Sequence, residues 1–389
     1  MRIGIDVRCF TEGRMTGVEE YTLNLLENLF KFDKKNDYIL FYNSFSKSNI
    51  DFSWAEKYSN VKIKKFCIPN KILNLFFWYL HWPKIDRMIG ETDVFFLPNI
   101  AFGSFSSKTK IVLTIHDLSF ERYAENFSWK RRFWHIFINP KKICQRVNQL
   151  IAVSESSKSD LESVYRIPAE KITCVYSGIS QIFKQVNRND PNLIKVKENY
   201  NLPYKFILYL GTFEPRKNII GIIKAFNHLR QKAKANNQIE MGKMNLVLAG
   251  YSGWLCDEIF KEIKNSPFSN DIFYLKSVPN KDKVYIYNLS SLFVYPSFFE
   301  GFGFPPLEAM SCEIPIISSN NSSLGEIINS GGILIDPDRK DEIYQAMKQI
   351  LSSKKLQEKL KEEGIKQAAN FYWQKTARET LKVFEKMSK

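Results

Sequence analysis

Short apolar runs rich in β-branched and aromatic residues alternate with longer segments of helical spacing along most of the chain. Residues 2–7, RIGIDV, predict a strand, and a turn-rich stretch with Gly13 and Gly17 follows it. Apolar side chains then recur at helical spacing over residues 19–32. Further strands are expected at residues 38–43, 93–98, 110–117, 149–154 and 171–180. This alternation predicts an α/β domain with a parallel sheet.

A polar stretch at residues 185–204 contains two prolines and few aliphatic residues, which predicts a linker. The strand–helix pattern restarts after it. Strands are expected at residues 206–211, 244–250, 271–276, 291–297, 314–319 and 331–336. We therefore expect two Rossmann-like α/β domains, residues 1–184 and 205–370, that face each other across a cleft. Ligands of such sheets bind at the loops that follow the strands.

The 389-residue chain is basic, with 56 Lys and Arg against 41 Asp and Glu and a formal net charge of +15. Residues 1–184 hold 27 basic and 19 acidic side chains, so both halves share the charge. A cationic surface attracts phosphorylated small molecules, anionic lipid or nucleic acid. We expect no nucleic acid as partner, because the charge is dispersed and no basic-aromatic binding module is apparent.

The six cysteines are far apart and form no C-x-x-C pair, which indicates reduced thiols in a cytoplasmic protein. Only four histidines are present, and they form no Cys/His cluster, so a zinc site is not indicated. The D-x-D at residues 336–338 resembles a motif of metal-dependent sugar transferases, but a turn after a strand explains it. The N-terminus has no apolar signal-peptide region, and no apolar run approaches the roughly 20 residues of a membrane span. We expect no metal and no cofactor.

Two aromatic segments have two possible interpretations. Residues 72–82, ILNLFFWYLHW, are too short to span a membrane, and residues 130–134, KRRFW, are basic and aromatic. We favour helices that pack on the core and carry solvated basic flanks. The alternative is a peripheral contact with the inner face of the plasma membrane.

The loop at residues 211–218, GTFEPRKN, follows the first strand of the second domain. Arg216 and Lys217 precede a predicted helix, for which Asn218 is a suitable N-cap. Cations beside exposed helix N–H groups form an anion site, and Arg binds phosphate oxygens bidentately. The alternative is a pair of solvated surface cations, but the position after a strand favours phosphate binding.

The first domain offers two candidates in its own post-strand loops. His116 ends the strand at residues 110–117 and precedes Asp117, so we expect it to point toward the cleft. A single histidine is otherwise more often structural. Gly17 permits close approach of the backbone to a ligand, although one loop glycine is usually only a turn residue.

Residues 297–310, SFFEGFGFPPLEAM, place two carboxylates around glycines and prolines after another strand. Gly301 and Gly303 would let backbone N–H groups approach a substrate. The two prolines suit the first turn of a helix. Glu308 is then expected in that first turn, near the positive end of the helix dipole, and Glu300 at the strand end. No G-x-G-x-x-G follows the first strand of either domain, which argues against a nicotinamide dehydrogenase.

Together these motifs resemble the retaining GT-B glycosyltransferases of family GT4. FEPRKN is followed by PSFFEGFGFPPLEAM, whose Glu300 and Glu308 are separated by seven residues as in that family. The further motifs TGVEEYT, HDLSF, VSESSKSDL, IPAEKITCVYSGI and NSSLGEII fall in the expected order along the chain, so the resemblance covers essentially the whole chain.

The resemblance implies a role for each candidate. Arg216 and Lys217 would hold the diphosphate of a nucleotide sugar, Glu308 the ribose hydroxyls, and Glu300 the transferred sugar. The implied nucleotide-sugar site comprises Gly17, Gly211, Arg216, Lys217, Glu300, Gly301, Phe302, Gly303 and Glu308. The implied catalytic residues are His116, Glu300, Arg216 and Lys217. The last helix, residues 371–389, would return to the first, acceptor-binding domain.

One departure from the family concerns the first loop, where Glu19 and Glu20 stand in place of a basic residue before Tyr21. An acidic pair near a diphosphate would be unfavourable unless it points away. The activity implied is metal-independent transfer of a hexose from UDP-glucose, preferred here over GDP-mannose, to a saccharide acceptor. A lipid-linked acceptor in polysaccharide biosynthesis is expected. A nucleotide-sugar epimerase or phosphorylase on the same fold is the alternative.

Overall fold

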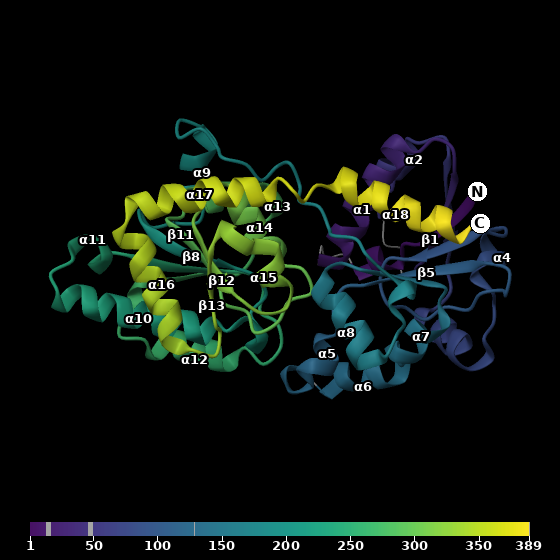
Figure 1. The fold of residues 1–389 in the computed structure, drawn as a ribbon, viewed down its shortest axis with the longest axis horizontal. Helices are drawn as coiled ribbons and strands as arrows, with labels where there is room; N and C mark the ends of the chain where they lie inside the picture. Colours follow the sequence, from purple (N-terminus) through teal and green to yellow (C-terminus); the bar gives the residue numbers. More distant parts are fainter. Residues whose placement is uncertain (13–16, 46–49, 128, 389) are drawn as a thin grey trace. The chain divides into compact units, whose positions relative to one another are not determined.

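The computed structural model describes residues 1–12, 17–45, 50–127 and 129–388. The chain forms two compact units, and Figure 1 shows a parallel sheet with flanking helices in each. Unit 1 comprises Met1–Leu118, Trp129–Gly178 and Tyr372–Lys389, and unit 2 comprises Ser119–Ser128 and Ile179–Phe371. The predicted α/β class with two Rossmann-like sheets is therefore confirmed.

Unit 1 has a seven-stranded parallel sheet in the order β3-β2-β1-β4-β5-β6-β7. Its strands are β1 (Arg2–Asp6), β2 (Asp37–Asn43), β3 (Val61–Phe66), β4 (Val94–Leu97), β5 (Lys110–Ile115), β6 (Gln149–Ala152) and β7 (Ile172–Cys174). Its helices are η1 (Arg8–Glu12), α1 (Gly17–Phe32), α2 (Ser53–Glu56), α3 (Asn70–Leu75), η2 (Phe76–Leu80), α4 (Ile85–Ile89), α6 (Trp129–Ile138), α7 (Pro140–Arg146), α8 (Glu155–Tyr165), η4 (Ala169–Lys171) and α18 (Trp373–Met387).

Unit 2 has a six-stranded parallel sheet in the order β10-β9-β8-β11-β12-β13. Its strands are β8 (Phe206–Leu210), β9 (Asn245–Ala249), β10 (Ile272–Leu275), β11 (Leu292–Tyr295), β12 (Ile316–Ser319) and β13 (Ile333–Ile335). Its helices are α5 (Ser119–Arg122), η3 (Ala124–Asn126), α9 (Pro191–Asn199), η5 (Pro215–Lys217), α10 (Ile219–Ala235), α11 (Ile239–Gly242), α12 (Asp257–Asn265), η6 (Ser269–Asp271), α13 (Asn280–Leu289), α14 (Phe304–Ser311), α15 (Ser322–Ile328), η7 (Asn329–Gly331), α16 (Lys340–Ser352) and α17 (Lys354–Ala368).

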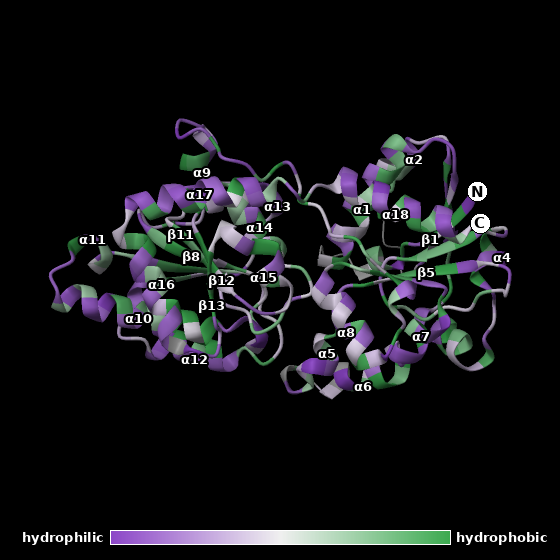
Figure 2. Ribbon diagram, viewed as in Figure 1, coloured by the Kyte–Doolittle hydropathy of each residue, from purple (hydrophilic) through white to green (hydrophobic). Residues whose placement is uncertain are grey.

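Both cores lie between the sheets and their helices. Strands β4, β6, β8 and β11 are buried along their whole length, as expected for central strands covered on both faces. Figure 2 shows hydrophobic residues concentrated on the strands of each sheet. Every strand that the sequence predicts is present. The edge strand β3 was not predicted, because its lysines interrupt the apolar pattern on its exposed positions.

The segment predicted as a linker, residues 185–204, lies inside unit 2 and contains helix α9. The Asp190 side chain caps this helix, and Pro191 begins it. Leu193 and Val196 are buried, and Tyr200 donates a hydrogen bond to Asp282 of α13 at 2.8 Å. Only Leu193 and Val196 on one face of α9 are buried, and the sequence around them is polar. The composition alone therefore suggested a linker.

The chain changes units at two other places, of which only the first differs from the predicted domain limits. Residues 119–128 group with unit 2, where the Tyr123 ring packs 5.6 Å from that of Phe299 and Phe127 stacks on Trp254. The family resemblance assigns residues 371–389 to the first domain. The structure groups Tyr372–Lys389 with unit 1, where α18 packs against α1 (Figure 1).

Candidate active site

Two strand-to-helix loops of unit 2 bring four charged side chains together. The loop after β8 contributes Glu214, Arg216 and Lys217, and the loop after the neighbouring strand β11 contributes Glu300. Arg216 Nη2 donates to Glu214 Oε1 at 2.6 Å, and Arg216 Nη1 lies 3.2 Å from Glu300 Oε2. Lys217 Nζ donates to Glu300 Oε1 at 2.5 Å and to the hydroxyl of Tyr295 at 2.7 Å. We call Glu214, Arg216, Lys217 and Glu300 the charge cluster.

Burial makes the partners in this cluster depend on one another. Glu214, Lys217 and Glu300 are buried, and Arg216 is nearly so. Burial alone would raise the pKa of Glu300, but attraction by Arg216 and Lys217 outweighs it and lowers the pKa to about 2. Burial, together with repulsion from Arg216, lowers the pKa of Lys217. The interpretation as two solvated surface cations is therefore wrong.

Serine and asparagine side chains fix the loop that carries Glu300. The Ser323 hydroxyl donates to the carbonyl oxygens of Glu300 and Phe302, both at 2.9 Å. Ser322 Oγ accepts from the Glu300 backbone N–H at 3.0 Å, and Asn321 Nδ2 donates to the Phe298 carbonyl at 2.9 Å. This segment follows β12, so a third strand-end loop orients the carboxylate.

Gly303 begins helix α14 in the left-handed region, with φ of 108°. The backbone conformation therefore favours glycine, and a Cβ added there would lie 2.7 Å from Leu324 Cδ2, so that the leucine side chain would have to move. The two prolines occupy the first turn, as predicted. Glu308 does not. It lies in the second turn, buried, and its Oε2 accepts a hydrogen bond from Tyr287 at 2.7 Å. The helix starts earlier than expected, because Gly303 and not a later residue is the N-cap.

Two further glycines of unit 2, Gly211 and Gly250, differ in how much room an added Cβ would have. A Cβ on Gly211 would meet the Tyr209 hydroxyl at 2.9 Å, which the side chain could relieve by moving. A Cβ on Gly250 would meet the Gly211 carbonyl oxygen at 1.9 Å. The close approach of backbones at the ends of β8 and β9 therefore requires Gly250, which was not among the predicted site residues.

His116 lies in unit 1, directly after β5. Its Nε2 is 2.9 Å from the Pro98 carbonyl oxygen, which can only accept a hydrogen bond. Nε2 must therefore carry the proton in the neutral ring, so Nδ1 is the basic nitrogen. The ring contacts the Tyr21 ring edge-on, with centroids 4.7 Å apart. Burial lowers the pKa of His116, so the imidazole is neutral at pH 7.

Gly17 is the first residue of α1 and not part of a loop. It is exposed, and a Cβ there would meet no atom within 4 Å. Glu19 and Glu20 lie in the first turn of the same helix, where its dipole favours acidic side chains. The predicted loop before Gly17 includes residues 13–16, which lie outside the described residues.

The chain matches known glycosyltransferases along both units. The profile of Glycosyltransferase Family 4 matches residues 15–181, and that of Glycosyl transferases group 1 matches residues 191–367. O-antigen chain mannosyltransferase B of Escherichia coli is 31% identical over 277 residues, which cover 71% of this chain and 70% of the relative. The chain belongs to glycosyltransferase family 4.

A second relative is also similar in sequence, and one solved structure shows the fold. The serotype-specific mannosyltransferase WbdA of Escherichia coli is 28% identical over 279 residues, which are 72% of this chain but only 34% of WbdA. The structure of sucrose-phosphate synthase from Thermosynechococcus elongatus superposes with a TM-score of 0.75 at 17% identity, covering 100% of this chain and 99% of that chain. The fold of this glycosyltransferase is GT-B.

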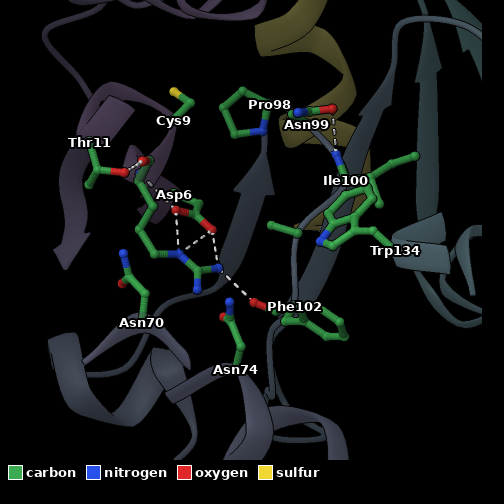
Figure 3. A pocket seen from close by; sticks show the side chains of 12 residues that line it. Asp6, Cys9, Thr11, Asn70, Asn74, Pro98, Asn99, Ile100, Phe102 and Trp134 are labelled. Carbon is green, nitrogen blue, oxygen red and sulfur yellow. Dashed lines mark hydrogen bonds and ion pairs between the residues drawn. The ribbon is translucent and has the colours of Figure 1, made fainter. Parts of the chain in front are cut away.

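Unit 1 of this glycosyltransferase contains a polar pocket of about 200 Å³ at the ends of β1 and β4 (Figure 3). Asp6 accepts a bidentate ion pair from Arg8, with Nη2 to Oδ2 at 2.6 Å. The pocket is lined by Asp6, Arg8, Cys9, Thr11, Asn70, Asn74, Pro98, Asn99, Ile100, Ala101, Phe102 and Trp134. Amide and apolar side chains, Trp134 among them, thus surround the net-neutral ion pair of Asp6 and Arg8.

The sequence pattern predicts three of the four members of the charge cluster, Arg216, Lys217 and Glu300, but not Glu214. A carboxylate two residues before Arg216 in a post-strand loop was the available signal. The pattern also gives no indication of Tyr287, Tyr295 or the serines after β12. Contacts between different strands of a sheet leave no regular spacing in the sequence. Among the described residues, no group of three or more His, Cys, Asp or Glu side chains is arranged to hold a metal ion.

Proposed function

We propose that this glycosyltransferase transfers a hexose from a nucleotide sugar to a saccharide acceptor, with the charge cluster as the donor's diphosphate and sugar site. The cluster supports this proposal because Arg216 and Lys217 lie at the sheet edge where α/β domains bind nucleotides. Lys217 is buried and Arg216 is nearly so, and cations in such a position are suited to stabilising the charge that develops on a leaving diphosphate. This is the observation on which the proposal chiefly rests.

The cluster also predicts that the donor must change existing ion pairs. The two cations are already balanced by Glu214 and Glu300. A diphosphate would share Arg216 and Lys217 with Glu300, which would leave that carboxylate able to accept hydrogen bonds from hydroxyl groups of the transferred sugar. Backbone N–H groups of Gly301, Phe302 and Gly303 would contact the same sugar.

We assign the other donor contacts as follows. Glu308 would accept hydrogen bonds from the ribose hydroxyls through its carboxylate, which Tyr287 orients. Gly17 and Gly211 would allow the phosphates to approach the backbone, and His116 would bind near the transferred sugar.

For the chemical step we propose retention without a metal ion. The acceptor hydroxyl would attack the anomeric carbon on the face from which the nucleoside diphosphate departs. A phosphate oxygen of the leaving group would take the hydroxyl proton. Because a buried carboxylate held by two cations is a poor base, Glu300 fits the role of a sugar ligand better than that of a nucleophile.

The relatives change the order of donor candidates. The mannosyltransferase from Escherichia coli supports mannose as the transferred sugar, so we place GDP-mannose before UDP-glucose. Its name also supports a role in O-antigen-type polysaccharide biosynthesis, which we propose takes place on the cytoplasmic side of the membrane. We propose that the acceptor is a lipid-linked saccharide and that its sugar binds in the polar pocket of unit 1.

A donor panel tests this function. Thermal shifts with GDP-mannose, UDP-glucose, GDP and UDP should single out one nucleotide sugar, with and without EDTA. The same donor should be slowly hydrolysed alone and consumed faster with a saccharide acceptor, giving a product with the donor's anomeric configuration by NMR. Conversion of the donor to an epimer without acceptor would support the epimerase alternative. No binding of any nucleotide sugar would refute the proposal.

A further inference from the structure

Unit 1 exposes large apolar side chains on two segments that are far apart in sequence. The first segment is α3, η2 and the turn after them, and the second is α6. We define the aromatic face as their exposed members Ile72, Leu75, Trp78, Tyr79, Leu80, Trp82, Phe133, Trp134, Ile136 and Phe137. The favoured prediction of core-packing helices is therefore wrong for most of these residues.

The two segments form one surface. The ring centroids of Trp78 and Phe137 lie 5.3 Å apart, and those of Phe133 and Phe137, both on α6, lie 5.6 Å apart. Leu73 and Phe77 of the first segment are buried and anchor it to the core. Their neighbours consequently project outward in fixed positions. Tyr79 and Ile136 are each 73% exposed.

An exposed apolar surface of this size indicates a binding partner. Its surroundings identify the chemistry of that partner. Residues 57–85 contain six lysines and no Asp or Glu, and residues 126–154 contain six Lys or Arg and no Asp or Glu. The rest of residues 1–184 holds 15 basic and 19 acidic side chains. The net positive charge of this half therefore comes from the two segments that carry the aromatic face and their flanks, because the rest of residues 1–184 is net negative.

We propose that the aromatic face binds the surface of an anionic lipid bilayer. Trp and Tyr side chains favour the headgroup level of a membrane, while apolar side chains enter the acyl boundary and cations pair with lipid phosphates. Among the described residues, no helix has the length and apolar character to cross the bilayer, so the contact is peripheral.

The position of the polar pocket adds a consequence that rests on the proposed function. Trp134 belongs to both the aromatic face and the pocket lining, and Asn70 and Asn74 of the pocket come from α3 (Figure 3). The pocket therefore opens beside the membrane-binding surface. An acceptor whose lipid stays in the bilayer would present its sugar there.

Vesicle co-sedimentation tests the surface without any transfer assay. The full chain should bind vesicles of phosphatidylcholine with phosphatidylglycerol at low salt and bind pure phosphatidylcholine about tenfold or more weakly. The double variant Tyr79→Ser, Ile136→Ser should lose at least about tenfold in binding to the anionic vesicles. Its matched control is Tyr204→Ser, Ile194→Ser in unit 2, where the two side chains are 82% and 62% exposed. This control should bind like the natural chain.

Two matched charge-reversal variants test whether lysines beside the aromatic face, rather than the net charge of the whole protein, attract the lipid. Lys71→Glu with Lys141→Glu should weaken binding, whereas Lys354→Glu with Lys355→Glu, equally charged and exposed in unit 2, should not. Equal losses in test and control pairs, or no binding of the natural chain to anionic vesicles, would overturn the proposal. So would a dimer in sedimentation velocity that Tyr79→Ser, Ile136→Ser converts to a monomer, since the face would then join two copies. Donor binding by thermal shift is measured on the same variants and should be unchanged, so failure here is distinct from failure of the proposed function.

Discussion

At the residue scale, the charge cluster explains why two cations of unit 2 are so constrained. Two carboxylates balance two cations, and every member is largely removed from water. In such a network, loss of one partner leaves an uncompensated buried charge, which costs more than the pair itself contributes. Each substitution in the cluster therefore has both a chemical and a structural effect, and the two must be measured separately.

Lys217→Ala should abolish sugar transfer, with kcat reduced by at least about a hundredfold, because the leaving diphosphate loses a cation in the transition state. Glu300 would retain Arg216, so we expect the protein to fold with a reduced unfolding temperature. Lys224→Ala, an exposed lysine on α10, is the control. Full transfer activity in the Lys217 variant would refute the phosphate assignment, and a normal melting temperature would refute the buried network.

His116 gives a pH-dependent prediction. Its folded-state pKa is lowered by burial from the ordinary value of 6.5, so the unfolded chain takes up a proton first as the pH falls. The stability contributed by the neutral ring is thus present above about pH 6.5 and is lost as the pH falls through the folded-state pKa. His116→Asn, which can still donate to the Pro98 carbonyl, should lose less stability between pH 7.5 and 5. Thermal unfolding across that range measures it, and parallel pH profiles for the two proteins would contradict the assignment.

At the element scale, helix α14 depends on its N-cap residue. The N-cap at Gly303 determines where the helix begins, and hence that Glu308 faces Tyr287 while Glu300 stays in the preceding loop. A backbone in the left-handed region costs a non-glycine residue about 1–3 kcal/mol. Local sequence thus sets the spacing between the two carboxylates that the family resemblance assigns to the donor.

Gly303→Ala should destabilise the protein by about 1–3 kcal/mol, because the added methyl combines backbone strain with a contact to Leu324. Gly17→Ala is the matched control, since its methyl would meet no atom within 4 Å and a helix favours alanine. Urea unfolding of both variants measures the difference. Equal stability of the two variants would contradict the strained N-cap at Gly303. If the Gly17 variant keeps normal stability but loses donor binding, the result would support the proposed role of Gly17.

At the scale of the whole molecule, the chain is not two consecutive domains. Its C-terminal helix α18 belongs to unit 1, and residues 119–128 belong to unit 2. In unit 1, the Phe384 ring lies 5.2 Å from that of Phe96, and Thr376 donates to the Tyr176 carbonyl at 2.8 Å. A Cβ on Gly178 would lie 2.2 Å from the Trp373 nitrogen. The fold of unit 1 is therefore incomplete without the last helix.

Phe384→Ala should destabilise unit 1 by about 3–5 kcal/mol, since it empties a fully buried aromatic site. Lys386→Ala on the exposed side of the same helix should have almost no effect. Differential scanning calorimetry should show the loss in one transition while the other keeps its temperature, with donor added to identify unit 2. An unchanged thermogram would mean that α18 contributes little to the core of unit 1.

The sequence by itself determined the parallel α/β class, nearly all strands, and the loops that carry Arg216, Lys217, Glu300 and Gly303. These follow from local causes: hydrophobic period, glycine and proline geometry, and the position of polar residues after strands. The same local logic failed for α9 and β3, whose buried positions are too few to show in composition.

Tertiary structure alone decided which side chains meet. Glu214 joins the cations, Tyr287 reaches Glu308, and the serines after β12 hold the Glu300 loop, because neighbouring parallel strands bring their ends to one sheet edge. It likewise decided that Trp78 and Phe137 lie outside the core, since exposure depends on what the rest of the chain covers. A linear pattern records which residues are apolar, but only packing determines which of them remain in contact with water.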